Sequence, residues 1–382
     1  MRHDVAHPSD DPAVEPEGAS VHRKRLGSVV IIGASSPLGR RVVDLTVRDE
    51  AVGRVVAVDI ADPDDAGTPP VAALAGGTGA SIERFVVMAG DDLRGPLAGA
   101  TAVLYLGWAA AGGLSQGGSD RIVAVADAVL RATEGVAPLS LVVVSSAMVY
   151  GAWTTNPVPL TDAAPVRPNP GFAPALALAE VERRVADWHD DHPANTVAVL
   201  RPVTTVAPDR PGWLARALRS ALGFPVEDHD PPTQFLHVDD LASAVDIVRR
   251  SGVEGTVNVA PDGWLDGAAR RALDVRPRIR LPEAVAARLH GWRWRLGVAP
   301  TPPELLPYAV HPWVVANDKV RSAGWVPEHT NEEAWVAGHP AGPLATLSPQ
   351  RRQELILGGA AVAAAGAGVV AGGAIRRRRR GG

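Results

Sequence analysis

The residues best suited to chemistry in this chain lie near its start, in the segment Gly33-Ala-Ser-Ser-Pro-Leu-Gly39. The segment follows a run of β-branched residues and precedes a helical pattern. In that setting the first glycine permits a tight turn, and the last glycine lets the helix approach the strand. The amino end of the helix then attracts a phosphate. The sequence therefore predicts a pyrophosphate site in which Ser35, Ser36 and Leu38 lie within the turn. A turn with a purely structural role is the alternative.

Ser36 stands where the usual pattern of such turns has a middle glycine. Its side chain must either avoid a bound phosphate or form a hydrogen bond to it. We therefore expect binding that is weaker or shifted, and not lost.

Asp59 ends the next β-branched run, 20 residues after Gly39. A carboxylate at this place accepts hydrogen bonds from both ribose hydroxyls and repels a 2′-phosphate. The combination of turn and carboxylate predicts a dinucleotide site with NAD preferred over NADP. The alternative is that Asp59 caps a helix or a turn in Asp-Ile-Ala-Asp-Pro.

These residues must be positioned by strands that alternate with helices. Short β-branched runs predict strands at Val29–Gly33, Val55–Asp59, Phe85–Met88, Ala102–Leu106, Leu141–Ser145, Val197–Leu200 and Gly255–Val259. Apolar stripes at helical spacing lie between several of them: Leu38, Val42 and Leu45; Ile122, Ala126 and Val129; and Leu178, Val181, Val185 and Trp188. This alternation predicts an α/β fold, a doubly wound parallel sheet of the Rossmann type with a smaller C-terminal substrate lobe.

Composition changes along the chain predict five segments. They are a disordered leader (1–27), an NAD-binding Rossmann core (28–201), a substrate lobe with closing elements (202–337), a linker (338–354) and an apolar Ala/Gly tail with an arginine cluster (355–382). Between Gly151 and Pro174 the chain is rich in proline and is expected to form a long loop that shapes a site.

Overall composition excludes several classes of function. The 38 basic and 42 acidic residues give a net charge of −4, so we expect no nucleic-acid partner. The absence of cysteine excludes disulfides, thiol nucleophiles and cysteine-bound metals, and is compatible with a cytoplasmic protein. We expect no metal site, because His189-Asp-Asp-His192 is more typical of a solvated helix end than of a metal centre.

Further motifs follow the glycine turn in a fixed order: Asp92-Leu93, Val103-Leu-Tyr-Leu-Gly-Trp108, Ser145-Ser-Ala-Met-Val-Tyr-Gly151, Leu200-Arg-Pro202, Phe235-Leu-His-Val-Asp-Asp240, Gly255-Thr-Val-Asn-Val259 and Gly324-Trp-Val-Pro327. In this order the chain resembles the extended short-chain dehydrogenase/reductases, specifically the NAD-dependent epimerase/dehydratase family. The resemblance implies an NAD cofactor, a small-molecule substrate such as a nucleotide sugar or a similar alcohol or ketone, and a homodimer.

The resemblance also implies roles for single residues. Asp92 and Leu93 would flank the adenine, and Leu106 and Gly107 would line the cofactor. Ser146 would occupy the position of the catalytic serine; the alternative is a serine at a strand end that is satisfied by local backbone. His237, Asp239 and Asp240 would lie beside the substrate cleft, although a helix amino end capped by aspartate before Leu241 is the favoured explanation of the two acids.

One part of the family pattern is missing. In the family a Tyr-x-x-x-Lys pair opens a helix that carries a glutamate eight residues after the tyrosine. If Glu180 is that glutamate, Phe172 lies where the family has its catalytic tyrosine and Leu176 where it has its lysine. The chemistry needs a phenol activated by a neighbouring ammonium, and a phenyl ring has no proton to give. Tyr105, Tyr150 and Tyr308 have no lysine four residues later, and Tyr150 is expected to be structural. We therefore expect little ordinary turnover unless a water, His237 or Ser146 substitutes. Two alternatives stay open: a non-catalytic protein that senses NAD or binds a partner, and a chain without cofactor affinity.

The C-terminal tail combines an uncharged run, Leu355–Ile375, with five consecutive arginines, Arg376–Arg380. The run is of membrane-span length, but six glycines and eight alanines make it weakly hydrophobic. A membrane span is one interpretation, but with a cytoplasmic cofactor domain it would place the arginines on the far side, against the positive-inside tendency. Contact of 355–380 with the inner face of a membrane, through anionic lipid, is the second. A flexible extension that ends in solvated arginines is the third.

Overall fold

A seven-stranded parallel sheet organises the chain. The computed structural model describes residues 27–61, 80–88, 90–107, 116–136, 138–209, 214–215, 217–218, 230–273, 283–296 and 302–339. The strand order is β3-β2-β1-β4-β5-β6-β9, and every neighbouring pair is parallel. The strands are β1 (Gly27–Ile32), β2 (Val52–Ala61), β3 (Ser81–Met88), β4 (Ala102–Tyr105), β5 (Ser140–Val144), β6 (Thr196–Pro202) and β9 (Gly255–Val259).

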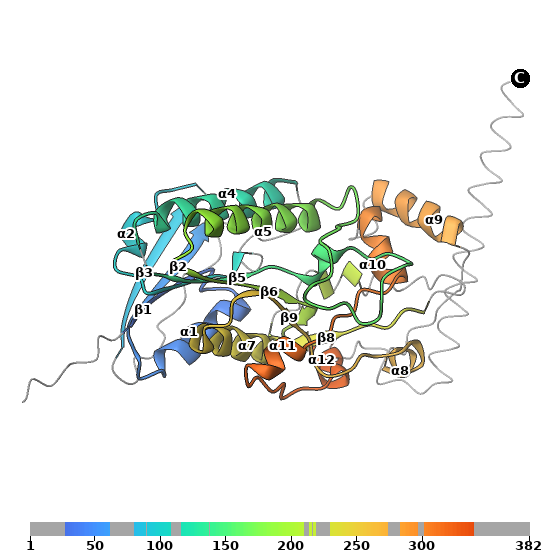
Figure 1. Cartoon of the computed structure of the whole chain (residues 1–382). Helices are drawn as coiled ribbons and strands as arrows, with labels where there is room; N and C mark the ends of the chain where they lie inside the picture. The colour runs from blue at the N-terminus through green and yellow to red at the C-terminus, as the bar shows by residue number, and fades with distance from the viewer. Residues whose placement is uncertain are drawn as a thin grey trace, which may run out of the picture.

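Two pairs of helices enclose this sheet (Figure 1). On one face α4 (Gln116–Thr133) packs beside α5 (Ala173–Asp191), and on the other α1 (Pro37–Val47) packs beside α7 (Val238–Ser251). The apolar stripes expected on α1, α4 and α5 face the core, since Val42, Ile122 and Val181 are fully buried. Burial of both faces explains why the central strands are continuous apolar runs.

The predicted doubly wound parallel sheet is therefore confirmed, and each predicted strand lies within or beside an observed one. The β-branched residues that indicated the strands now form the buried core, with Val30, Val56 and Val103 inaccessible to solvent. Two parallel strands of only three residues, β7 (Thr204–Val206) and β8 (Phe235–His237), were not predicted, because so short a run carries no periodicity.

The remaining elements mostly belong to the C-terminal part, and all but α9 are short. They are α2 (Arg94–Leu97), η1 (Ala147–Tyr150), α8 (Gly267–Leu273), α9 (Glu283–Arg295), η2 (Pro303–Leu305), α10 (Leu306–Val310), α11 (Asp318–Ser322) and α12 (Asn331–Gly338). The division of the chain after residue 201 stays a prediction, although α7 and β9 from beyond it pack with the main sheet.

Several predicted segments lie outside the described residues. These are the leader up to residue 26, most of the linker, and the tail with Leu355–Ile375 and Arg376–Arg380. Among the described helices none combines the length and the apolar character needed to cross a bilayer. Membrane contact by the tail, a cytoplasmic location and pairing of two copies stay predictions.

Candidate functional site

The glycine turn connects β1 to α1 at the carboxyl edge of the sheet. Gly33 has a φ of 92°, which favours glycine, and its N–H donates to the carbonyl oxygen of Val58 at 2.8 Å. At Gly39 a Cβ atom would lie 2.1 Å from the carbonyl oxygen of Gly33. Both glycines are therefore required by the geometry: one by its dihedral angle, the other by the close approach of helix and turn.

The Ser36 hydroxyl points into the turn. Ser36 is the N-cap of α1, where its Oγ donates to the Gly33 carbonyl at 2.7 Å and accepts from the Gly39 N–H at 2.9 Å. The side chain thus leaves room for a phosphate but occupies one amide that could bind it. Since Pro37 has no N–H, Leu38 is the one residue among the first three of the helix whose amide stays available to an anion.

Asp59 lies beside this turn, near the end of β2. Its Oδ1 accepts a hydrogen bond of 2.7 Å from the backbone N–H of Ser35. The bond fixes the carboxylate next to the helix amino end, where the positive end of the helix dipole stabilises a negative charge. The second carboxylate oxygen can still accept hydrogen bonds from a ligand.

Leu106 and Gly107 follow β4, the strand next to β1. Leu106 is fully buried, and its N–H donates to the carbonyl oxygen of Ile32 at 3.0 Å, so it lies directly beside the glycine turn. At Gly107 a Cβ would collide with the ring of Tyr105. Asp92 and Leu93 lie before α2. The Asp92 carboxylate is exposed and accepts from the Arg94 N–H at 3.0 Å, whereas Leu93 is buried.

Two serines follow β5 and have different partners. The Ser145 hydroxyl donates to Glu182 on α5 at 2.5 Å, and Glu182 forms a buried ion pair with Arg201. The Ser146 hydroxyl caps η1 by accepting from the Met148 N–H at 3.3 Å. Ser146 is only 3% exposed. Its hydrogen bond with Met148 is a contact with local backbone, as expected for a structural serine at a strand end.

The two residues predicted to replace the family's proton donor lie at the start of α5. Phe172 is the N-cap residue, fully buried, with its ring centroid 5.3 Å from that of Tyr308. Leu176 lies one turn later on the same side of the helix and is 42% exposed. An apolar cavity continues beyond Tyr308, lined by Val203, Thr204, Leu218, Thr233, Gln234, Phe235, Trp313 and Val314.

All three tyrosines are buried and their hydroxyls are engaged. Tyr150 donates to Asn258 Oδ1 at 2.7 Å, Tyr105 to the carbonyl oxygen of Ile122 at 2.8 Å, and Tyr308 to that of Met148 at 2.8 Å. Burial raises the pKa of Tyr150 above its ordinary value, although the Arg201 guanidinium beside its ring opposes this. None of these phenols has the depressed pKa of an activated proton donor.

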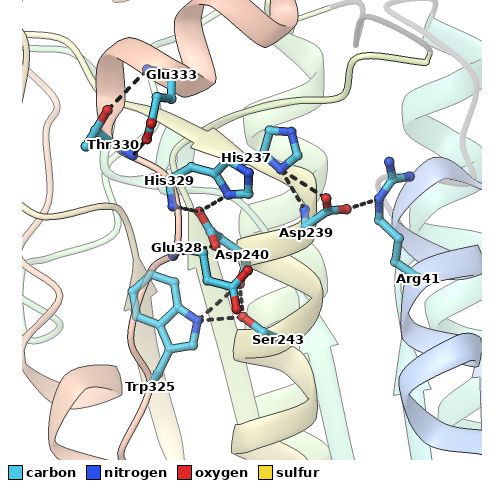
Figure 2. Close-up of polar contacts among 10 residues, drawn as sticks. All are labelled: Arg41, His237, Asp239, Asp240, Ser243, Trp325, Glu328, His329, Thr330 and Glu333. Carbon is cyan, nitrogen blue, oxygen red and sulfur yellow. Dashed lines mark hydrogen bonds and ion pairs between the residues drawn. The ribbon is translucent and has the colours of Figure 1, made fainter. Parts of the chain in front are cut away.

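A second polar cluster surrounds the start of α7 (Figure 2). His237 is the N-cap, since its Nδ1 accepts from the Asp239 N–H at 3.3 Å, and Asp239 also pairs with Arg41 of α1. The buried Asp240 carboxylate accepts from the backbone N–H groups of Glu328 and His329 at 2.8 and 3.1 Å. Asp239 and Asp240 therefore tie α7 to α1 and to the segment before α12. His237, and not an aspartate as expected, caps the helix.

His329 joins this cluster although no sequence pattern pointed to it. Its ring stacks on that of His237 with centroids 3.9 Å apart and planes inclined by 22°. His237, Asp239 and His329 bring one potential ligand atom each to within 4.8 Å of one another. A metal, however, binds in the plane of an imidazole ring, and one ion cannot lie in the planes of two stacked rings. With Asp239 also paired to Arg41, the arrangement fits a cation poorly.

Comparisons with known proteins agree with this geometry. The sequence profile of the NAD dependent epimerase/dehydratase family matches residues 29–260. No curated protein matches the chain.

Similar solved structures include dTDP-glucose 4,6-dehydratase of Bacillus anthracis in complex with NAD, with 14% identity, a TM-score of 0.53 and coverage of 82% of this chain and 95% of that one. UDP-glucose 4-epimerase of Thermotoga maritima with UDP-glucose shares 15% identity at a TM-score of 0.56, covering 81% and 97%. UDP-N-acetylglucosamine 4-epimerase of Methanobrevibacter ruminantium shares 16% sequence identity at a TM-score of 0.57, and the match covers 82% of this chain and 97% of that one. At these identities the likeness is one of fold.

Proposed function

Because the chain belongs to the NAD dependent epimerase/dehydratase family, we propose that it binds NAD at the turn Gly33–Gly39, with Asp59 on the adenosine ribose. The observation that carries this proposal is the 2.7 Å hydrogen bond from the Ser35 N–H to Asp59. It holds a carboxylate beside the helix amino end, as ribose recognition requires.

The residues of the turn fit the pyrophosphate, with a reduced set of donors. The inward hydroxyl of Ser36 leaves space, but Ser36 and Pro37 together leave the Leu38 amide as the main backbone donor of the first turn. Asp92 and Leu93 would flank the adenine, with Leu106 and Gly107 on the opposite side of the turn. We therefore expect binding weaker than that of a turn with three glycines.

Calorimetric titration with NAD and NADP tests this site. The expected result is binding of NAD and at least tenfold weaker binding of NADP, because Asp59 repels the 2′-phosphate. Gly39→Ala should abolish binding, since its Cβ would meet the Gly33 carbonyl at 2.1 Å. Gly95→Ala is the matched control, because no atom lies within 4 Å of the Cβ that it adds. A wild-type protein that binds neither dinucleotide would refute the proposal.

We further propose that the substrate is a nucleotide sugar or a similar small alcohol or ketone, turned over slowly. When bound, NAD supplies a hydride acceptor, but the accompanying proton transfer has no phenol at Phe172 and no ammonium at Leu176. Loss of one general acid/base lowers the rate by about 10²–10⁴-fold.

A non-catalytic role is the second candidate, and the contacts of Ser146 favour it. Its hydroxyl is buried and caps η1. In that case Ser146→Ala leaves NAD binding unchanged and has no activity to reduce, whereas in a slow enzyme the same substitution lowers NADH-linked turnover.

Restoring the two missing groups separates the candidates. Phe172→Tyr with Leu176→Lys should raise NAD-linked turnover of nucleotide sugars at least a hundredfold if only the proton donor is absent. The control is Leu176→Lys alone, which changes an exposed side chain without adding a phenol. No gain in the double variant, with NAD binding retained, would favour the non-catalytic role.

A further inference from the structure

Helix α9 carries an apolar stripe that the rest of the described protein leaves exposed. We name as the α9 stripe Val285, Leu289, Trp292 and Leu296, which are spaced by four, three and four residues and so share one helical face. The helical path reaches Leu296, whose N–H donates to the carbonyl oxygen of Trp292 at 3.1 Å. Trp292 is 61% exposed, Leu296 56% and Val285 47%, whereas Leu289 is half-buried. Trp294, on the opposite face of the helix, is 42% exposed. Such a cluster on one helix differs from the single exposed apolar residues of most surfaces.

Arginines border the α9 stripe. Arg288 and Arg295, seven residues apart, lie along one edge and are both exposed, and Arg293 lies along the other. Although α9 is only weakly amphipathic, exposed tryptophan and leucine bordered by arginine are residue types that suit contact with the interface of a membrane. Tryptophan prefers the headgroup level, and arginine is attracted to anionic lipid.

Among the described residues, α9 lies at the edge of the molecule (Figure 1). The helix lies at the outer end of the C-terminal lobe, remote from α1 and the glycine turn (Figure 1). Its contacts with the described elements include the turn η2. Further along the chain the sequence again combines an apolar run, Leu355–Ile375, with Arg376–Arg380. Two separate segments of one chain thus have the composition that anionic lipid attracts.

We propose that the α9 stripe docks on an anionic lipid surface, with Trp292 and Leu296 in the headgroup region and Arg288 and Arg295 against lipid phosphates. The proposal is independent of the NAD site, because the two lie far apart. A second copy of the chain is the competing occupant, but the bordering arginines would then face one another across a twofold contact.

Co-sedimentation of the full chain with vesicles tests this surface. Vesicles of phosphatidylglycerol and phosphatidylcholine in equal parts should bind the protein, and vesicles of phosphatidylcholine alone should bind it much less. Trp292→Ser with Leu296→Ser should raise the lipid concentration for half-maximal binding about tenfold. Arg288→Gln with Arg295→Gln should have a similar effect and should reduce the salt dependence.

The matched control is Trp264→Ser with Val336→Ser, which removes a tryptophan and an aliphatic residue of comparable exposure, 43% and 61%, outside α9. The measurements are repeated in the full chain with Arg376–Arg380 replaced by Gln, so that the tail is assessed separately. The proposal is overturned if the stripe variant binds as the control does in both backgrounds, or if the wild type binds no vesicles. Self-association that the stripe variant abolishes, without vesicle binding, would assign the face to a second copy.

Discussion

At the scale of single residues, we expect Asp59 to decide which dinucleotide the proposed site accepts. Its carboxylate accepts from the Ser35 N–H, and in the proposed site its negative charge would repel a 2′-phosphate. Asp59→Asn keeps an oxygen that can accept from Ser35 and removes only the charge. We expect the ratio of the NADP to the NAD dissociation constant to fall at least tenfold, measured by calorimetry.

The control for this substitution is Asp44→Asn, which removes an exposed charge from α1 away from the turn. An unchanged preference in Asp59→Asn would show that the carboxylate does not face the ribose. The Ser36 side chain has a structural contact at the same turn, since its hydroxyl accepts from the Gly39 N–H and caps α1.

At the scale of elements, helix α5 carries two glutamates that differ in their exposure to solvent. Glu182 is 8% exposed and joins Ser145 of the β5 end to Arg201 of β6. Glu180 lies two residues earlier on the outer side, where hydrogen bonds from Arg183 and then Arg184 lower its pKa to about 2. The buried pair connects the helix to the sheet, whereas the outer pairs are largely screened by water.

Glu182→Gln should therefore destabilise the protein by about 3 kcal/mol, because it leaves the Arg201 charge buried without a counter-charge. Glu180→Gln, on the more solvated side of the same helix, should destabilise the protein less than Glu182→Gln does, because water screens its pairs with Arg183 and Arg184. Urea denaturation of both variants measures the difference. Equal effects would mean that the ion pair with Arg201 contributes nothing beyond its hydrogen bonds.

At the scale of the whole molecule, the stacked histidines connect α7 to the segment before α12 and make stability depend on pH. Burial, and then the proximity of His329, lowers the pKa of His237 below its ordinary value. The unfolded chain then binds more protons than the native protein once the pH falls below about 6.5. The contribution of His237 is fully present above that pH and is lost progressively as the pH falls.

His237→Asn should flatten this dependence while keeping an N-cap acceptor for the Asp239 N–H. The free energy of unfolding of the wild type should fall between about pH 7 and 5 with a slope from this group of at most about 1.4 kcal/mol per pH unit. Urea titrations across this range measure both proteins. Parallel curves would exclude His237 as the source.

The sequence by itself determined the architecture of the sheet and the turn Gly33–Gly39, and it predicts that Phe172 and Leu176 replace the family's proton donor. Each rests on local information: β-branched runs, helical periodicity, glycine spacing and the absence of a residue type. These properties depend on residues that are close neighbours in the chain, so they can be predicted from patterns in the sequence.

Only the tertiary structure decided which polar groups meet. It turned Ser36 inward, buried Glu182 rather than Glu180, and brought His329 to Asp240 across 89 residues. It also left the α9 stripe uncovered among the described residues. The physical reason is that burial and side-chain pairing depend on which elements pack together. Elements that pack together can lie far apart in the chain, and no periodic pattern in the sequence indicates which of them will meet.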